Sequence, residues 1–120
     1  MRRFHSTKII LRFKNNAAGF ISAYATHTPE AEQNAFVDIR GKIVAICDQF
    51  FIDQNEILEV IEAGAYSKLT KHLEKYLALS KTVIEQDTRR VFYDLDAAKP
   101  YLFFSDQDTP DTVTEIEFRA

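Results

Sequence analysis

The chain has 120 residues, of which 46% are apolar and 28% charged, and its net charge at neutral pH is −3. This balance excludes a disordered or collagen-like chain, and the length suits one domain with its own hydrophobic core. Because no run of 18 apolar residues occurs, we expect no membrane span. The single cysteine, Cys47, cannot form an intramolecular disulfide, and no secretory signal is evident, which favours a reducing, cytoplasmic setting.

The first 30 residues predict two strands. Apolar and polar residues alternate from 7 to 13, the period of a half-buried strand, and a second alternating stretch covers 20–25. Between them, Asn15, Asn16 and Gly19 suit a hairpin loop.

Two helices are expected next. Thr28 and Pro29 suit a helix start, and from there apolar residues recur at helical spacing to about residue 51, with Gly41 as a possible break. The predicted buried face consists of Ala35, Phe36, Ile39, Ile43, Ile46, Cys47 and Phe50. A second helix is expected from Asp53, which forms a pair of the capping-box type with Glu56, to Gly64.

A third helix is predicted from Ser67 to Ser80, burying Leu69 and Leu73 on one face. After it, period-two patterns at 82–86, 91–96, 101–104 and 112–118 predict four strands. We therefore expect a single α+β domain over residues 1–120, in the order β-β-α-α-α-β-β-β-β, with helices packed on one face of a mainly antiparallel sheet.

Motifs that carry chemistry are weak in this sequence. The three histidines lie in different predicted elements without metal-ligand spacing, and Cys47 lies on a predicted apolar face, where a thiol behaves as a small hydrophobic group. Residues 106–117 resemble a calcium loop only in part, because Pro110 and Asp111 occupy its fifth and sixth positions. No glycine-rich phosphate loop is present. We predict no catalytic residue, no metal site and no cofactor, so enzymatic activity stays open with a negative leaning.

Charge is unevenly distributed. Residues 1–29 and 66–90 carry +5 and +3, whereas 30–65 and 91–120 carry −6 and −5. The basic segments supply a candidate partner-binding set: Arg2, Arg3, Lys8, Arg12, Lys14, Lys68, Lys71, Lys75, Arg89 and Arg90. These cations could instead pair internally, for example Glu56, Glu59 and Glu62 with the three lysines.

Charged and aromatic side chains together suggest a binding surface. The chain has ten Phe and five Tyr, and Phe103 and Phe104 point to opposite faces if 101–104 is a strand. Our first hypothesis is a non-enzymatic protein-binding module, a small regulator, adaptor or inhibitor that recognises an acidic protein surface. The alternative is a nucleic-acid-associated domain using the basic amino-terminal hairpin and third helix, and the third is a small enzyme. A homodimer is also compatible with the sequence.

Overall fold

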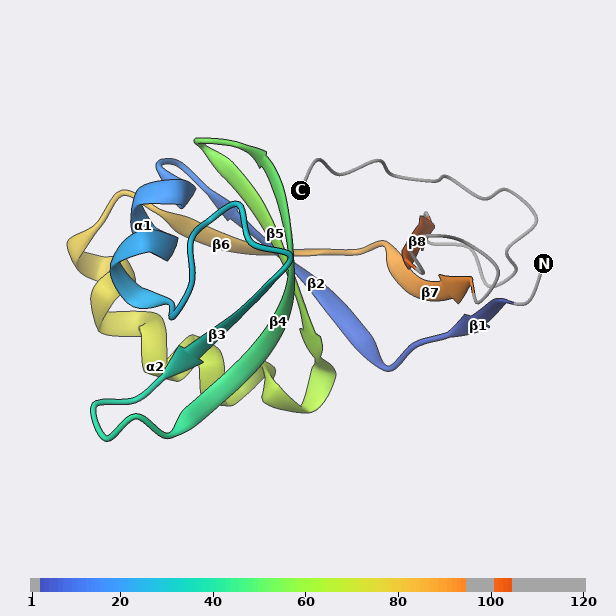
Figure 1. The fold of residues 1–120 in the computed structure, drawn as a ribbon, viewed down its shortest axis with the longest axis horizontal. Helices are drawn as coiled ribbons and strands as arrows, with labels where there is room; N and C mark the ends of the chain where they lie inside the picture. The colour runs from blue at the N-terminus through green and yellow to red at the C-terminus, as the bar shows by residue number, and fades with distance from the viewer. Residues whose placement is uncertain (1–2, 95–100, 105–120) are drawn as a thin grey trace.

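A computed structural model of the chain describes residues 3–94 and 101–104. Its main element is an antiparallel sheet of five strands in the order β3-β4-β5-β2-β6. The bounds are β2 (Lys8–Lys14), β3 (Gln33–Val37), β4 (Ile43–Asp53), β5 (Glu56–Glu62) and β6 (Val83–Asp87). Helices α1 (Ala17–Tyr24) and α2 (Tyr66–Leu79) complete this part of the fold, with a short 3₁₀ helix, η1 (Ala63–Ala65), leading into α2 (Figure 1).

A second, smaller antiparallel sheet is connected to the first by two links in the chain, β1 to β2 and β6 to β7. It consists of β1 (Arg3–His5), β7 (Arg90–Asp94) and β8 (Tyr101–Phe104), in the order β1-β7-β8. Strand β1 leads into β2, and β6 leads into β7, so the small sheet extends from the same end of two neighbouring strands (Figure 1).

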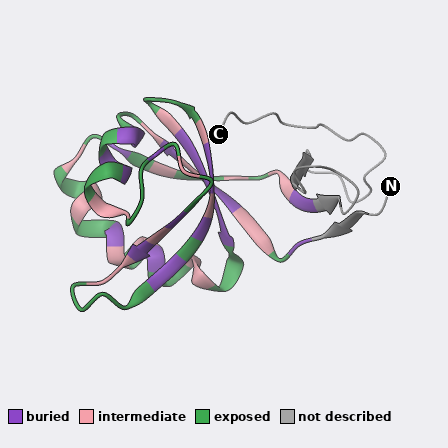
Figure 2. Cartoon of the chain, viewed as in Figure 1, coloured by how far each residue is buried: buried purple, intermediate pink, exposed green. Residues whose placement is uncertain are grey.

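The main core lies between the five-stranded sheet and both helices. Phe13 of β2 is fully buried there, with its ring centroid 6.0 Å from those of Phe20 in α1 and Phe36 in β3. Leu69 and Leu73 of α2 belong to the same cluster and are fully buried. Figure 2 shows the buried parts of α2 and of the sheet in purple. Because side chains alternate along a strand, residues on either side of Phe13 face away from the helices.

A smaller apolar cluster lies on the opposite face of the sheet. It joins Ile10, Phe50, Leu58 and Val60 to Val91 of β7. The start of β7 therefore covers one end of that face, while charged side chains occupy the rest of it, as described below.

The α+β class is confirmed in its broad form, an antiparallel sheet with helices. The predicted order and the third helix are wrong, because the described elements contain two α-helices with three strands between them. The helix predicted over 67–80 is α2, and the patterns at 82–86, 91–96 and 101–104 correspond to β6, β7 and β8. The strand predicted at 112–118 lies outside the described residues.

The strand predicted at 20–25 is wrong, since α1 occupies that stretch. Asn15 and Asn16 adopt positive φ angles of 66° and 54°, which turn the chain out of β2 and directly into α1. Asparagine tolerates this left-handed conformation better than most residues do. The asparagines therefore mark a strand-to-helix turn rather than a strand-to-strand hairpin.

The helix predicted from Pro29 to residue 51 is also wrong: β3 and β4 form a hairpin there. Asp38 Oδ1 accepts hydrogen bonds from the backbone amides of Arg40 and Lys42, each at 2.9 Å, and Gly41 has a φ of 78°. Glycine adopts that φ without steric cost, so the segment turns where a helix would have needed to continue.

The helix predicted from Asp53 is wrong, because this stretch forms strand β5. The Asp53–Glu56 pair lies in the hairpin turn between β4 and β5. Asp53 Oδ1 accepts from the amides of Asn55 and Glu56 at 2.8 and 2.9 Å. The predicted helix cap is therefore wrong: the Asp53 carboxylate accepts from two amides of the β4–β5 turn.

Candidate protein-binding surfaces

The predicted cations of β2 lie on the sheet face that points away from the helices, and each meets a carboxylate. Lys8 Nζ donates to Asp48 of β4 at 3.0 Å, and Lys14 Nζ lies 3.6 Å from Glu85 of β6. The first pair reaches across β5 to β4, and the second joins β2 to its neighbour β6; the sequence predicted neither arrangement. The internal pairing considered for the basic segments therefore occurs, but with different acids.

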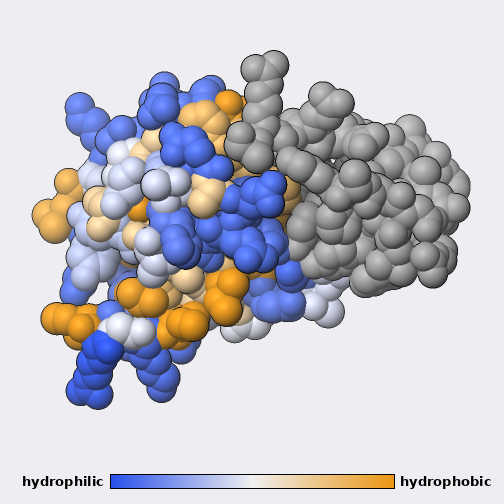
Figure 3. All heavy atoms as spheres, in the orientation of Figure 1, coloured by the Kyte–Doolittle hydropathy of each residue, from blue (hydrophilic) through white to orange (hydrophobic). Residues whose placement is uncertain are grey.

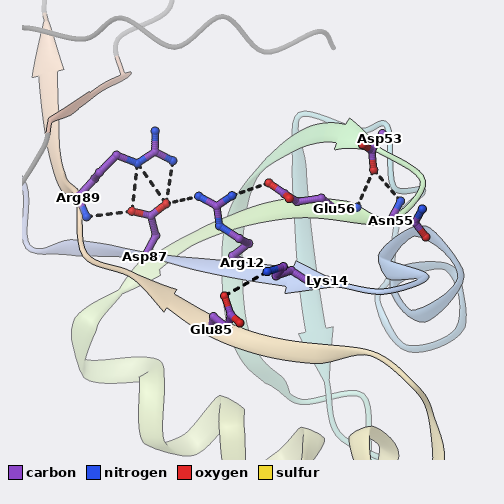
Figure 4. Close-up of polar contacts among 8 residues, drawn as sticks. All are labelled: Arg12, Lys14, Asp53, Asn55, Glu56, Glu85, Asp87 and Arg89. Atoms are coloured by element: carbon purple, nitrogen blue, oxygen red, sulfur yellow. Dashed lines mark hydrogen bonds and ion pairs between the residues drawn. The ribbon is translucent and has the colours of Figure 1, made fainter.

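Arg12 is the centre of this charged face (Figure 4). Its guanidinium donates to Glu56 of β5 and to Asp87 of β6, both at 2.6 Å, and Arg89 donates to the same Asp87 at 2.7 Å. Arg12 joins three strands, and its two partners offset its charge. Lys14 and Glu85 lie on the same face.

The electrostatics of Asp87 follow from this arrangement. Burial acts to raise its pKa, but hydrogen bonds from Arg89 and Arg12 outweigh burial and lower the pKa to about 2. The hydrogen bond to Asp87 in turn raises the pKa of Arg12. Since these carboxylates offset the charge of the arginines, the pairs leave little positive charge to attract a phosphate backbone.

The three lysines of α2 behave differently. Lys68, Lys71 and Lys75 are exposed, and no carboxylate of the described residues lies within ion-pair distance of them. Lys75 Nζ lies 4.9 Å from the ring centroid of Tyr76, which itself stacks on Tyr24 of α1 at 4.5 Å. These lysines are not paired with Glu56, Glu59 or Glu62, which all lie on β5.

The remaining predicted partner-binding residues are not gathered with them. Arg2 lies outside the described residues, and Arg3 and Arg90 lie in β1 and β7 of the small sheet. Lys8, Arg12 and Lys14 lie on the sheet face opposite the helices, whereas Lys68, Lys71 and Lys75 lie on α2. The predicted residues that the structure describes therefore do not form one basic face.

The β3–β4 hairpin carries apolar side chains that the sequence pattern placed in the core. Ile39 in the turn is fully exposed, and Ile43 and Ile46 on β4 are 52% and 63% exposed. The turn also presents Arg40 and Lys42, both exposed. We call Ile39, Arg40, Lys42, Ile43 and Ile46 the hairpin surface; hydrophobic side chains gather beside hydrophilic ones over this hairpin in Figure 3.

The charges near the hairpin turn are partly fixed by the backbone. Hydrogen bonds from the amides of Lys42 and Arg40 lower the pKa of Asp38. The Asp38 carboxylate is therefore ionised and held inside the turn, while the two cations beside it extend into solvent.

One acidic residue, Glu59 of β5, lies inside the core. It is fully buried, its two cross-strand neighbours are Leu11 and Gln49, and neither carboxylate oxygen has a hydrogen-bond partner. Burial raises its pKa well above the ordinary value, and the charge of Asp48 raises it further. Cys47 is also buried, on β4, where burial and the nearby acids raise its thiol pKa. Its position confirms the prediction of a structural cysteine, although on a strand.

Among the described residues, no three His, Cys, Asp or Glu side chains are grouped closely enough to hold a metal ion. None of the helices in the described part of the chain is both long and apolar enough to cross a bilayer. Comparison with protein-family models, with curated proteins and with solved structures gives no match to this chain.

Sequence reasoning missed the hairpin surface and Glu59, for which different signals were available. Asp38 and Gly41 are a turn signal inside the supposed helix, and a hairpin there would have moved Ile39 out of the core. Glu59 carries a weaker signal, since it is an acid flanked by Leu58 and Val60 in a run of β-branched and aliphatic residues.

Proposed function

We propose that this protein is a non-enzymatic protein-binding module that recognises an acidic partner through the hairpin surface. The observation that supports it is the set of exposed isoleucines, Ile39, Ile43 and Ile46, beside Arg40 and Lys42. Isolated exposed apolar residues are ordinary, but several on one hairpin with cations at its turn resemble the apolar centre and charged rim of an interface.

The α2 lysines have a separate role in this proposal. They lie on α2 and not on the hairpin, and so add to the positive field that an approaching acidic partner meets, without direct contact at the apolar centre. Such charges chiefly change the rate of association, whereas buried apolar contacts chiefly change the rate of dissociation. Lys68, Lys71 and Lys75 would therefore speed encounter with an acidic partner.

The experiment compares three variants of the full chain in capture from the native host, followed by kinetics with the purified partner. The first is Ile39→Ser with Ile46→Ser, and the second is Lys68→Glu, Lys71→Glu and Lys75→Glu. The matched control, Ile52→Ser, changes an exposed isoleucine outside both groups.

We expect the isoleucine variant to dissociate faster and the lysine variant to associate more slowly at low salt, with the control unchanged. A captured protein that binds all four chains at equal rates would contradict the proposal. Capture of RNA or DNA with a steep salt dependence, lost in the lysine variant alone, would favour the nucleic-acid alternative instead.

A further inference from the structure

The two edge strands of the five-stranded sheet, β3 and β6, differ in whether another segment covers them. At the β3 edge, the chain after α1 returns alongside the strand: Ala25 forms a bridge with Phe36, and the Thr26 amide donates to the Ala35 carbonyl at 3.0 Å. The buried Asn34 side chain secures this segment by donating to the His27 carbonyl at 2.9 Å and accepting from the His27 amide at 2.8 Å. The β3 edge is therefore covered.

The β6 edge is open with respect to the described residues. Strand β6 pairs with β2 on one side, and no described residue hydrogen-bonds to its backbone from the other side. An uncovered edge offers a row of amides and carbonyls to which an extended segment can add as a further strand. The carboxylates of β6 do not block it, because Glu85 and Asp87 face Lys14 and Arg12 on β2.

A groove of about 670 Å³ lies beside this edge, between β6 and α2. Its apolar wall includes Leu77 and Ala78 of α2 and Ile84 of β6, with the 45% exposed Val83 at one end. Alternate side chains of an added strand would enter this groove, since they point to the same sheet face as Ile84.

The charges around the groove indicate the chemistry of an occupant. Lys71 lines it, and Lys81 is exposed at the start of the connection to β6. Glu74 also lines the groove, but the cations Lys68 and Lys75 lie on the same solvent side of α2. The local charge is therefore positive and complements an acidic segment.

We propose that the β6 edge and the α2–β6 groove bind an extended acidic peptide segment of a partner protein, with apolar residues at every second position. The segment adds to the sheet beside β6, its apolar side chains fill the groove, and a carboxylate meets Lys71. This is a second binding surface, on the other sheet edge from the hairpin surface, and it does not depend on that surface.

The experiment is a selection from a phage-displayed library of random eight-residue peptides on the full chain, followed by affinity measurements with the enriched peptides. Ala78→Trp fills the groove, and Ser67→Trp is the matched control at another exposed position of α2. Lys71→Glu changes the charge of the groove without filling it. Amide hydrogen exchange of residues 83–87 reports on strand addition, and circular dichroism confirms that each variant is folded.

We expect enriched peptides with alternating apolar residues and at least one acid. They should protect β6 amides, bind the Ser67→Trp control normally, lose at least tenfold in affinity to Ala78→Trp, and weaken on Lys71→Glu. If Ala78→Trp does not fold, the Lys71→Glu result and the exchange data still decide the matter. No enrichment, peptides without acids, or peptides that perturb the β3–β4 hairpin instead of β6 would overturn this inference. The last result would still agree with the proposed hairpin surface.

Discussion

Replacing Glu59 by glutamine should change how the stability of this protein depends on pH. The folded state holds the Glu59 carboxyl fully buried, with both oxygens lacking hydrogen-bond partners, and its pKa is raised well above the ordinary value. The unfolded chain exposes the same carboxyl to water, where a glutamate titrates near pH ~4.3. The native state therefore binds one more proton than the unfolded state between these two pKa values.

The sign and size of the effect follow from linkage. The stability contributed by protonated Glu59 is fully present below the unfolded pKa and is lost as pH rises towards the folded pKa. One proton changes the free energy of unfolding by about 1.4 kcal/mol per pH unit in that window. Glutamine has nearly the same shape but does not ionise, so it removes this slope. Asp87 does not interfere, because its pKa of about 2 places its loss of stability at acidic pH.

The measurement is urea unfolding of wild type and Glu59→Gln at half-unit steps from pH 5 to 8. The difference in unfolding free energy should grow in favour of glutamine by about 1.4 kcal/mol per pH unit until it levels at the folded pKa. Glu62→Gln is the control, on the same strand but exposed and hydrogen-bonded to Thr7. Parallel stability curves for wild type and Glu59→Gln across this range would refute the reasoning.

Three further expectations concern the turns and the cysteine. Gly41→Ala should destabilise by about 1–2 kcal/mol, since its φ of 78° suits glycine, while Gly64→Ala, with open space around the added methyl group, should be neutral or slightly stabilising in the same urea assay. Asp53→Ala should lower the free energy of unfolding by about 1 kcal/mol, because the turn loses two hydrogen bonds within the protein, and an unchanged urea midpoint would contradict this. Cys47 should react with a small thiol reagent only as the protein unfolds, so rapid labelling under native conditions would exclude its buried placement.

Elements whose structure depends on local interactions were predicted from the sequence more accurately than elements that depend on contacts with distant strands. Helix α2 was predicted within one residue at each end, because its amphipathic pattern and its contacts agree. Residues 33–53 were misassigned because their isoleucines happen to recur at helical spacing, whereas the backbone is set by the Asp38 and Gly41 turn and by a bulge beside Val37. Periodicity alone cannot separate these cases over short apolar runs.

The charged face shows a second limit of prediction from sequence, which concerns contacts between strands far apart in the chain. Arg12 was chosen as a candidate because of its basic neighbours in sequence, yet its partners Glu56 and Asp87 come from strands 44 and 75 residues away. Strand order decides such pairs, and no residue pattern specifies that β2 lies between β5 and β6. The same holds for the open edge of β6, which exists only because that strand is last in the sheet.

The place of β2 between β5 and β6 also has a consequence for folding during synthesis. Its two ladder partners, β5 and β6, end at Glu62 and Asp87. Strand β2 therefore cannot be paired on both sides until most of the described chain has been synthesised. Strands β3, β4 and β5 are consecutive hairpins and need only short loop closures. At roughly 5–20 residues per second, the interval between Lys14 and Asp87 lasts several seconds, which is long compared with hairpin formation. The β3–β4–β5 meander should therefore form first, β2 should pair with β5 next, and β6 should add to β2 last.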